Sequence, residues 1–205
     1  MIPVMIHGME YLATTIVWNI PVGGGVRQVQ LDHSFYSRKV EVFLDGEKQL
    51  EHIGNMRRIP QKFPFKIGSM ECSLAIVKTD NVFGYSIEVD SKPLPVYKEQ
   101  YQKKFDTWFP KIGGEVYRVV LDKVLLELYS NGEKIENDRH FMDNGAVTYF
   151  KLAGVSCRIE AQKTENAITN NFYTPEGSVP LDTKQDAETF KFDAERFFNS
   201  GFDNL

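Results

Sequence analysis

Hydrophobic and polar residues alternate along most of the chain, in runs of about five to eight positions. In residues 27–31 the apolar Val29 and Leu31 alternate with glutamines, and Cys157, Ile159 and Ala161 alternate with charged residues in the same way. Glycine, proline, asparagine or aspartate interrupts these runs at short intervals. A two-residue period with frequent turn residues predicts successive β-strands, each with one solvated face. We therefore expect an all-β fold of antiparallel sheets.

Two dipeptides predict the tightest turns between these strands. Asp45-Gly46 and Asn131-Gly132 each follow an apolar run and precede a Glu-Lys pair. Aspartate, asparagine and glycine tolerate the positive φ angles of two-residue hairpin turns. The three glycines at residues 23–25 lack the lysine of a phosphate-binding loop. We expect them to form a tight turn that joins the first two strands.

The two halves of the sequence resemble each other. Five segments recur in the same order: 18–26 resembles 108–116, 29–32 resembles 119–122, 43–48 resembles 129–134, 65–72 resembles 150–157, and Pro93-Leu94 resembles Pro180-Leu181. The conserved order indicates duplication of a unit of about 85 to 90 residues. We expect two tandem all-β domains, over residues 14–95 and 104–181, that are related by internal duplication.

Residues 92–106 lie between these units and carry a different period. Tyr97, Tyr101 and Phe105 are spaced four apart, which predicts a short helix. This aromatic stripe, with lysines interleaved, could stack on nucleic-acid bases. At the junction of two units we favour the other interpretation, that the stripe packs one unit against the other.

Residues 182–205 lie outside the repeat and form an acidic, phenylalanine-rich tail. Asp186 precedes Phe190, Phe197 and Phe198, and Gly201 follows them, a pattern that predicts a short C-terminal helix with an acidic start. Two roles fit this tail. It could order on a partner protein, or it could cover a groove of its own chain.

The composition narrows the class of protein. The 205 residues hold 24 Lys and Arg against 28 Asp and Glu, a net charge of −4, which disfavours attraction to nucleic acid or anionic lipid. No apolar run approaches the roughly 20 residues of a membrane-spanning helix, and the first residues do not resemble a secretory signal. Cys72 and Cys157 occupy equivalent strands of separate units, so we expect them not to pair. Two cysteines fit a reducing compartment, and we expect a cytoplasmic protein.

The residues that often carry catalysis or bind metals show no recognisable pattern. His7, His33, His52 and His140 lie without Asp, Glu or Cys at metal-ligand spacing. The motifs of serine hydrolases, phosphate-binding loops and zinc proteases are missing. We predict no catalytic, cofactor-binding or metal-binding residues.

Two repeated residue types have both a functional and a structural interpretation. Asp32 and Asp122 could be paired carboxylates for acid–base catalysis, but a turn residue copied with the unit is the simpler account. Trp18 and Trp108 open the two units, and we expect core side chains rather than a ligand platform.

Positive charge gathers on one loop of the first unit. Arg57, Arg58, Lys62 and Lys66 surround Pro60 and Pro64, and the second unit lacks this charge. The loop could receive an acidic partner, or it could be a solvated hairpin. We take Arg57, Arg58 and Lys62, with Phe190, Phe197 and Phe198 of the tail, as the predicted partner-binding residues.

Both units resemble the Fas apoptotic inhibitory molecule family. The resemblance rests on Trp18, residues 23–25, 29–33, 38–46, 65–68 and 85–89 in the first unit, and on residues 107–108, 117–121, 131–132, 141–145 and 157–161 in the second. It runs from about Thr15 to Ala161. The chain departs from the family pattern in the basic loop at 55–62, after Thr164, and in the tail.

The resemblance implies a cytosolic, non-enzymatic protein of two β-sandwich-like domains. It also implies antagonism of death-receptor-induced apoptosis and a part in limiting protein aggregation; in an organism without death receptors, the second role would be the shared one. We therefore expect a protein-interaction module whose partners are signalling proteins or aggregation-prone clients, with possible self-association. Two rivals remain: a carrier of small hydrophobic ligands in a β cavity, and an enzyme whose site forms between the domains.

Overall fold

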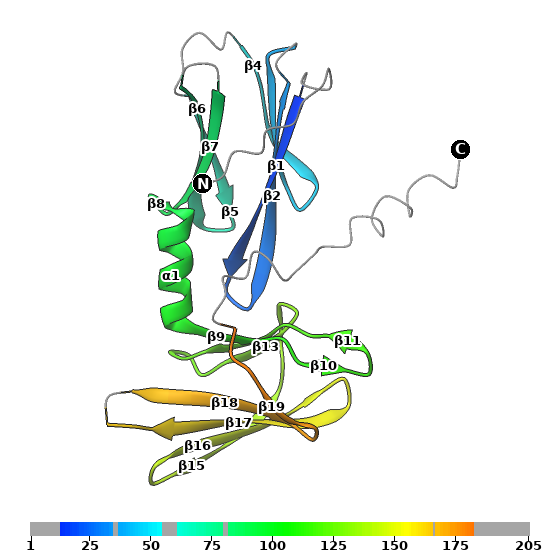
Figure 1. The fold of residues 1–205 in the computed structure, drawn as a ribbon, viewed down its shortest axis with the longest axis vertical. Coiled ribbons are helices and arrows are strands. Elements are labelled where there is room, and N and C mark those ends of the chain that lie inside the picture. The colour runs from blue at the N-terminus through cyan, green and yellow to red at the C-terminus, as the bar shows by residue number, and fades with distance from the viewer. Residues whose placement is uncertain (1–12, 35–36, 55–60, 80–81, 166, 183–205) are drawn as a thin grey trace, which may run out of the picture.

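The computed structural model describes residues 13–34, 37–54, 61–79, 82–165 and 167–182. Two antiparallel sheets form its N-terminal half (β1–β8), which is drawn in blue to green in Figure 1. The first sheet contains β1 (Ala13–Val22), β2 (Gly25–Ser34), β3 (Lys39–Leu44) and β4 (Glu47–Ile53) in that order. The second contains β5 (Gln61–Ile67), β6 (Met70–Thr79), β7 (Val82–Val89) and β8 (Lys92–Pro93) in that order.

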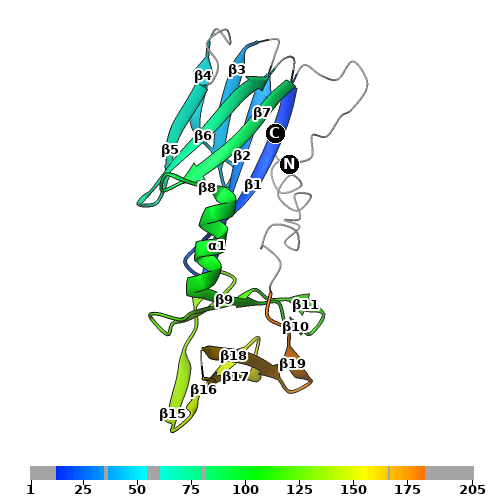
Figure 2. The ribbon, with the colours of Figure 1, turned by 60° about the vertical axis from the view of Figure 1, so that its left-hand side comes forward.

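The C-terminal half (β9–β19) again has two main sheets, which Figure 2 shows below the helix. The upper sheet has the order β14-β13-β12-β9, from β9 (Phe105–Trp108), β12 (Val119–Asp122), β13 (Leu128–Ser130) and β14 (Glu133–Lys134). The lower sheet joins β15 (Asn137–Met142), β16 (Gly145–Leu152), β17 (Val155–Lys163), β18 (Ile168–Thr174) and β19 (Gly177–Val179) in sequence order. β10 (Lys111–Ile112) and β11 (Glu115–Val116) form a small hairpin. The predicted all-β antiparallel fold is confirmed.

Each half encloses its own hydrophobic core between its two sheets. In the N-terminal half the alternating side chains of β2, β3 and β6 meet, and Val29, Leu31, Val42 and Leu74 are fully buried. In the C-terminal half Trp108 and Phe172 are fully buried and their rings meet edge to face. Full burial stabilises such a side chain by about 1.5–3 kcal/mol. Trp18 packs against the first core and Trp108 lies inside the second, so the structural interpretation of both tryptophans is confirmed.

The predicted hairpin turns are also confirmed. Asp45 (φ 50°) and Gly46 (φ 83°) join β3 to β4, and Asn131 (φ 49°) and Gly132 (φ 91°) join β13 to β14. Each turn is anchored the same way: the Asp45 carboxylate accepts the Gln28 backbone N–H, and the Asn131 side-chain carbonyl accepts the Arg118 backbone N–H, both at 2.8 Å. The glycines after Val22 form the tight turn between β1 and β2.

The two halves also resemble each other in strand pairing and strand order. In the first sheet of each half, Trp18 pairs with Val29, and Trp108 pairs with Val119. The strand order β5-β6-β7-β8 matches β16-β17-β18-β19, so β15 is the extra strand of the C-terminal half. Internal duplication predicts this agreement of order and register, and the duplication and its boundaries stay predictions.

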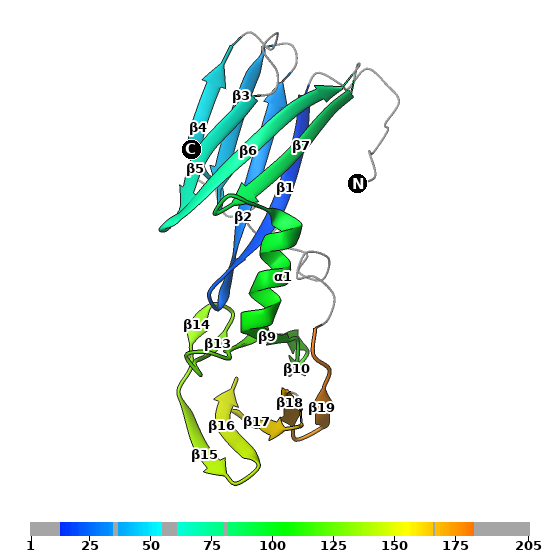
Figure 3. The same ribbon diagram turned by 90° about the vertical axis from the view of Figure 1, so that its left-hand side faces the viewer.

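A helix, α1 (Leu94–Lys104), connects the halves, as the spacing of residues 97–105 predicts (Figure 3). Leu94 and Tyr97 belong to the first core, and the rings of Tyr101 and Phe105 stack at 4.4 Å over the buried Val120. The aromatic stripe therefore packs one half against the other.

The turn between β1 and β2 completes this junction. Arg118 is 3% exposed, and its guanidinium donates to the Gly24 carbonyl at 2.6 Å. The Tyr101 hydroxyl donates to the Gly23 carbonyl, also at 2.6 Å. A Cβ on Gly24 would lie 2.2 Å from Cγ of Tyr129. The backbone at Gly24 therefore lies so close to the C-terminal half that only glycine fits at this position.

Candidate functional site

The predicted basic loop lies mostly outside the described residues. Of its members, Lys62 stands on β5, where its ammonium group pairs with Glu88 of β7 at 3.2 Å. Arg57 and Arg58 fall outside the described part of the chain, as do Phe190, Phe197 and Phe198 of the tail. The structure therefore places one of the six predicted partner-binding residues, in an ion pair on the outer face of a sheet.

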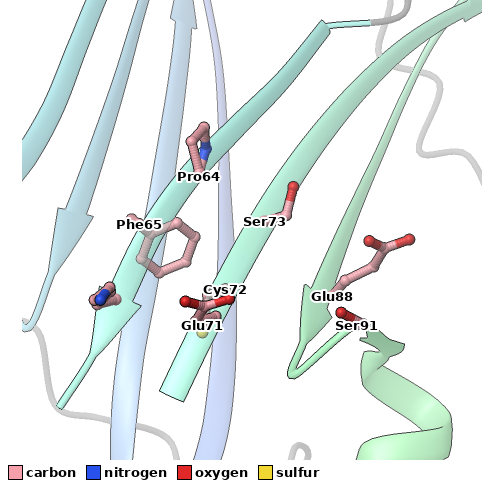
Figure 4. Close-up of a pocket in the computed structure, with 8 residues that line it drawn as sticks. Pro64, Phe65, Glu71, Cys72, Ser73, Glu88 and Ser91 are labelled. Atoms are coloured by element: carbon pink, nitrogen blue, oxygen red, sulfur yellow. The ribbon is translucent and has the colours of Figure 1, made fainter. Parts of the chain in front are cut away.

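A shallow pocket of about 420 Å³ lies beside this ion pair (Figure 4). It opens on the sheet β5–β8 near the turn from β7 to β8, and its lining includes Phe65, Glu71, Cys72, Ser73, Glu88 and Ser91. Burial raises the pKa of the Cys72 thiol to about 11, so this thiol is protonated at neutral pH and a poor nucleophile. The lining mixes carboxylates and hydroxyls with apolar side chains, and the pocket is open to solvent rather than enclosed as the cavity of a β-barrel carrier is. The pocket gives the ligand-carrier alternative no support.

Both cysteines are free and buried, each in the core of its own half. The expectation that they do not pair is confirmed. Burial also raises the pKa of the Cys157 thiol. The two thiols are therefore structural side chains in this fold.

The histidines stand apart from one another. His33 is fully buried on β2 and its Nδ1 lies 2.9 Å from the Tyr85 hydroxyl, while His52 packs against Phe63 and His140 pairs with Asp138. His7 lies outside the described residues. Within the described ranges, no three His, Cys, Asp or Glu side chains gather as metal ligands would.

The two repeated aspartates have separate structural roles. Asp122 ends β12 and accepts the backbone N–H groups of Val124 and Leu125, as a turn residue does. Its burial alone would raise its pKa, but these hydrogen bonds and Lys104 lower it. The prediction of a turn residue is wrong for Asp32, because β2 continues to Ser34 and its carboxylate accepts hydrogen bonds from the Thr15 and Gln30 side chains. The two carboxylates lie in different halves and form no acid–base pair.

The edges of the N-terminal sheets differ sharply in charge. On one side, β4 carries Lys48, which pairs with Glu41 and Glu51, and β5 carries Lys62, Pro64 and Lys66. On the other side lie β1, which has no charged residue, and β7, which has none before Glu88. The short β8 pairs only with Glu88 and Val89, so residues 82–87 of β7 have no partner strand beyond that edge among the described residues.

These two uncharged edges lie side by side (Figure 3). Tyr85 of β7 bonds through its hydroxyl to His33 of β2, and it is also hydrogen-bonded to Thr14 of β1. Val17 on β1 is 47% exposed and Val82 on β7 is 61% exposed. The edges therefore present apolar side chains and backbone hydrogen-bonding groups on one side of the molecule.

A second exposed apolar surface lies at one end of the C-terminal half. It comprises Val124, Leu125 and Leu126 of the β12–β13 loop, Phe141 and Met142 of β15, and Ile168 of β18, all between 43% and 74% exposed. These residues are not among those predicted from the sequence to bind partners. The one available signal was the run of three aliphatic residues between Lys123 and Glu127, which no turn residue interrupts.

No helix of the described residues is long and apolar enough to cross a membrane. The described helix α1 has 11 residues.

Comparison with known proteins identifies relatives along most of the chain. The model of the Fas apoptotic inhibitory molecule (FAIM1) family matches residues 14–181, which include strands of both halves. Fas apoptotic inhibitory molecule 1 of Mus musculus is 31% identical over 149 residues, 71% of this chain and 82% of that protein. The Homo sapiens protein of the same name is 30% identical over the same shares, and the Bos taurus protein is 31% identical over 80% of this chain and 84% of its own length. The chain belongs to the Fas apoptotic inhibitory molecule family.

Proposed function

We propose that the protein is a non-enzymatic inhibitor of apoptosis that acts by binding other proteins at the free edges of β1 and β7. Family membership supports the apoptotic role, because the relatives are named as Fas apoptotic inhibitory molecules. One observation carries the proposed mode of binding: the uncharged edges of β1 and β7 lie together, while charged residues mark the edges β4 and β5.

The contrast between the edges has a physical reason. An unpaired edge offers a row of N–H and C=O groups that can pair with any extended chain, and proteins usually block such edges with charges or proline. Lys48, Glu51 and Pro64 do so on β4 and β5. β1 carries no charge and holds its single proline, Pro21, next to its last residue, and residues 82–87 of β7 hold neither charge nor proline. Both edges fit the addition of a strand from a partner, whose side chains would contact Val17 and Val82.

The same edges fit a role in limiting protein aggregation. An aggregating client exposes extended apolar segments, and a strand that pairs with β1 or β7 is removed from further growth of the aggregate. The proposed partners are thus signalling proteins or aggregation-prone clients with an extended, weakly charged segment. Arg57, Arg58 and Lys62 remain proposed contacts for acidic groups on a partner.

We also propose that residues 14–95 and 104–181 are duplicated domains and that the protein works in the cytoplasm. The matching turn anchors at Gln28 and Arg118, which are 90 positions apart, support the duplication. Two buried free thiols fit a reducing compartment.

The test places a lysine on each free edge. The double variant Val17→Lys/Val82→Lys should lose protection against caspase activation in Fas-stimulated cells, because desolvating two ammonium groups opposes strand pairing. It should also lose suppression of the aggregation of reduced insulin, followed by light scattering.

The matched control is Ile53→Lys, which charges an exposed aliphatic residue (66%, against 47% for Val17 and 61% for Val82) on the protected edge β4. We expect this control to behave as the wild type, and the fluorescence of Trp18 verifies folding of the half that carries the substitutions. Equal activity of the double variant and the control in both assays would contradict the proposal.

A further inference from the structure

We propose that residues 183–205 fold back onto the exposed apolar end of the C-terminal half. This end, which we call the open end, is formed by Val124, Leu125, Leu126, Phe141 and Ile168. The inference goes beyond the proposed function, because it concerns another half of the molecule and does not depend on pairing at β1 or β7.

The open end exists because the two sheets of the C-terminal half differ in length. Strands β9, β12, β13 and β14 have four, four, three and two residues, whereas β15, β16, β17 and β18 have six, eight, nine and seven. The long sheet therefore extends past the short one. The part of the long sheet that extends past the short sheet faces the β12–β13 loop instead of strands.

The side chains at the open end continue the inner face of the long sheet. Phe141 pairs with Ala146, which pairs with Ala161, and these positions alternate in phase with the buried Phe150 and Ile159. Core-facing positions are normally covered, yet Phe141 is 74% exposed and Ile168 is 66% exposed. Val124 and Leu125 of the facing loop are 70% and 62% exposed. An apolar surface shared by two sheets in this way is typical of a surface that binds another segment.

The chain leaves the described region in the direction of the open end. Leu181 forms an antiparallel bridge with Trp108, and the Asp182 N–H donates to the Thr107 carbonyl at 2.8 Å. Continuation in this register leads past Asp106 and Phe105. Phe105 pairs with Asp122, the residue before the exposed loop, and Asp106 accepts a hydrogen bond from Asn170 near the start of β18.

Length and composition fit the same occupant. Residues 183–205 can span up to about 75 Å when extended, far more than the few residues of β9 that separate Asp182 from the open end. They contain five of the fifteen phenylalanines of the chain. Burial of phenylalanine side chains against exposed aliphatic residues is favourable by about 25 cal/mol per Å² of apolar surface.

In the N-terminal half, the segment that follows the last strand packs onto the core of that half. Pro93-Leu94 corresponds to Pro180-Leu181 in sequence, and the residues after Pro93 form α1, which packs Leu94 and Tyr97 onto the core of its own half. If the predicted duplication holds, the segment after Leu181 occupies the sequence position that α1 occupies after Pro93. Packing of Phe190, Phe197 and Phe198 on the open end would repeat this arrangement.

The experiment attaches a nitroxide spin label to the full chain through Ser200→Cys. Cys72 and Cys157 are each 4% exposed with raised thiol pKa values, so the label reacts at the new cysteine. We expect the label to broaden the amide NMR signals of residues 124–126, 141–146 and 168. Unchanged signals at these positions, or broadening confined to other surfaces, would overturn the proposal.

Two controls separate the proposed contact from its rivals. Phe197→Asp/Phe198→Asp in the labelled chain should abolish the broadening, as should Leu125→Asp. Val116→Asp, an equally exposed valine (55%) on β11, should leave it intact. A mixture of labelled unenriched chain and unlabelled ¹⁵N chain should show no broadening; broadening there would mean that the tail binds a second copy and would contradict the proposal.

Discussion

The N-terminal half closes its core between two long sheets, whereas the C-terminal half closes its core between a short sheet and a long one. β1 and β2 have ten residues each, but their counterparts β9 and β12 have four. Apart from β15 and the small hairpin β10–β11, the strand order of the two halves nevertheless agrees. Strand order and register therefore do not determine how much of one sheet the facing sheet covers, because that depends on the length of the strands.

The cores reflect this difference. The fully buried residues of the first core are mostly aliphatic, such as Val29, Leu31 and Leu74, and the second core is organised around the stacked Phe150 and Phe172 with Trp108. Aromatic rings bury more area per residue than aliphatic side chains. A short sheet can thus still enclose a core, but its stability then depends on few side chains.

The largest expected effect comes from removing one of these rings. Phe172→Ala should lower the free energy of unfolding by about 3–5 kcal/mol, because it leaves a cavity beside Trp108. Ile87 of β7 pairs with the buried Leu74 as Phe172 of β18 pairs with the buried Ile159. Ile87→Ala should cost the N-terminal half less, within about 2–5 kcal/mol. Each half holds one of the two tryptophans. In urea denaturation, the Trp108→Phe background therefore reports unfolding of the N-terminal half through Trp18, and the Trp18→Phe background reports unfolding of the C-terminal half through Trp108. An equal or larger loss for Ile87→Ala would refute the contrast between the cores.

The junction decides whether the halves unfold together. Gly24→Ala brings a Cβ to 2.2 Å from Tyr129 and should destabilise the junction by about 1–3 kcal/mol. We expect the unfolding transitions reported by Trp18 and Trp108 to coincide in the wild type and to separate in this variant. Gly84→Ala is the control, because its Cβ would meet nothing closer than 3.8 Å. Separate transitions already in the wild type would show that the junction does not couple the halves.

The turns at Asp45-Gly46 and Asn131-Gly132 should contribute equally to the stability of their two halves. Asp45→Ala and Asn131→Ala each remove an acceptor for one backbone N–H and place alanine at a positive φ. We expect each to cost about 1–2 kcal/mol, and the two values to differ by less than about 1 kcal/mol. Urea denaturation of the two variants measures both. A large loss in one half alone would count against equivalent turns.

The smallest expected effect is a pH dependence confined to the N-terminal half. Burial lowers the pKa of His33 below its ordinary value of 6.5, so the unfolded chain binds a proton that the folded chain does not at mildly acidic pH. The free energy of unfolding should therefore fall as the pH decreases below about 6.5. His33→Gln should remove this part of the slope, whereas the exposed His140→Gln should not. An unchanged slope in His33→Gln would contradict the assignment.

Local features of the fold could be predicted from the sequence. The turns at Asp45-Gly46 and Asn131-Gly132, the helix around Tyr101 and the unpaired cysteines follow from residue types and spacing that act over a few positions. The position of Asp32 inside β2 could not be predicted, because its alternation with Leu31 indicates which face it occupies but not how far the strand continues.

The candidate surfaces could not be predicted in the same way. A two-residue period does not reveal which strands lie at a sheet edge, because pairing joins residues that are distant in the chain. The sequence of β7 alone does not show that β8 leaves residues 82–87 unpaired. Likewise, Phe141 is an ordinary core position by its period, and its exposure arises from the shortness of the facing sheet.

Recognition of other proteins at the edges of β1 and β7 is the central feature of the proposed function. Backbone hydrogen exchange of the full chain, measured by mass spectrometry with and without reduced insulin, tests it most directly. We predict slower exchange in β1 and in residues 82–87 when the client is present, and no change in β4 or β5. Protection of β4 and β5 instead, or of neither side while aggregation is suppressed, would contradict the account.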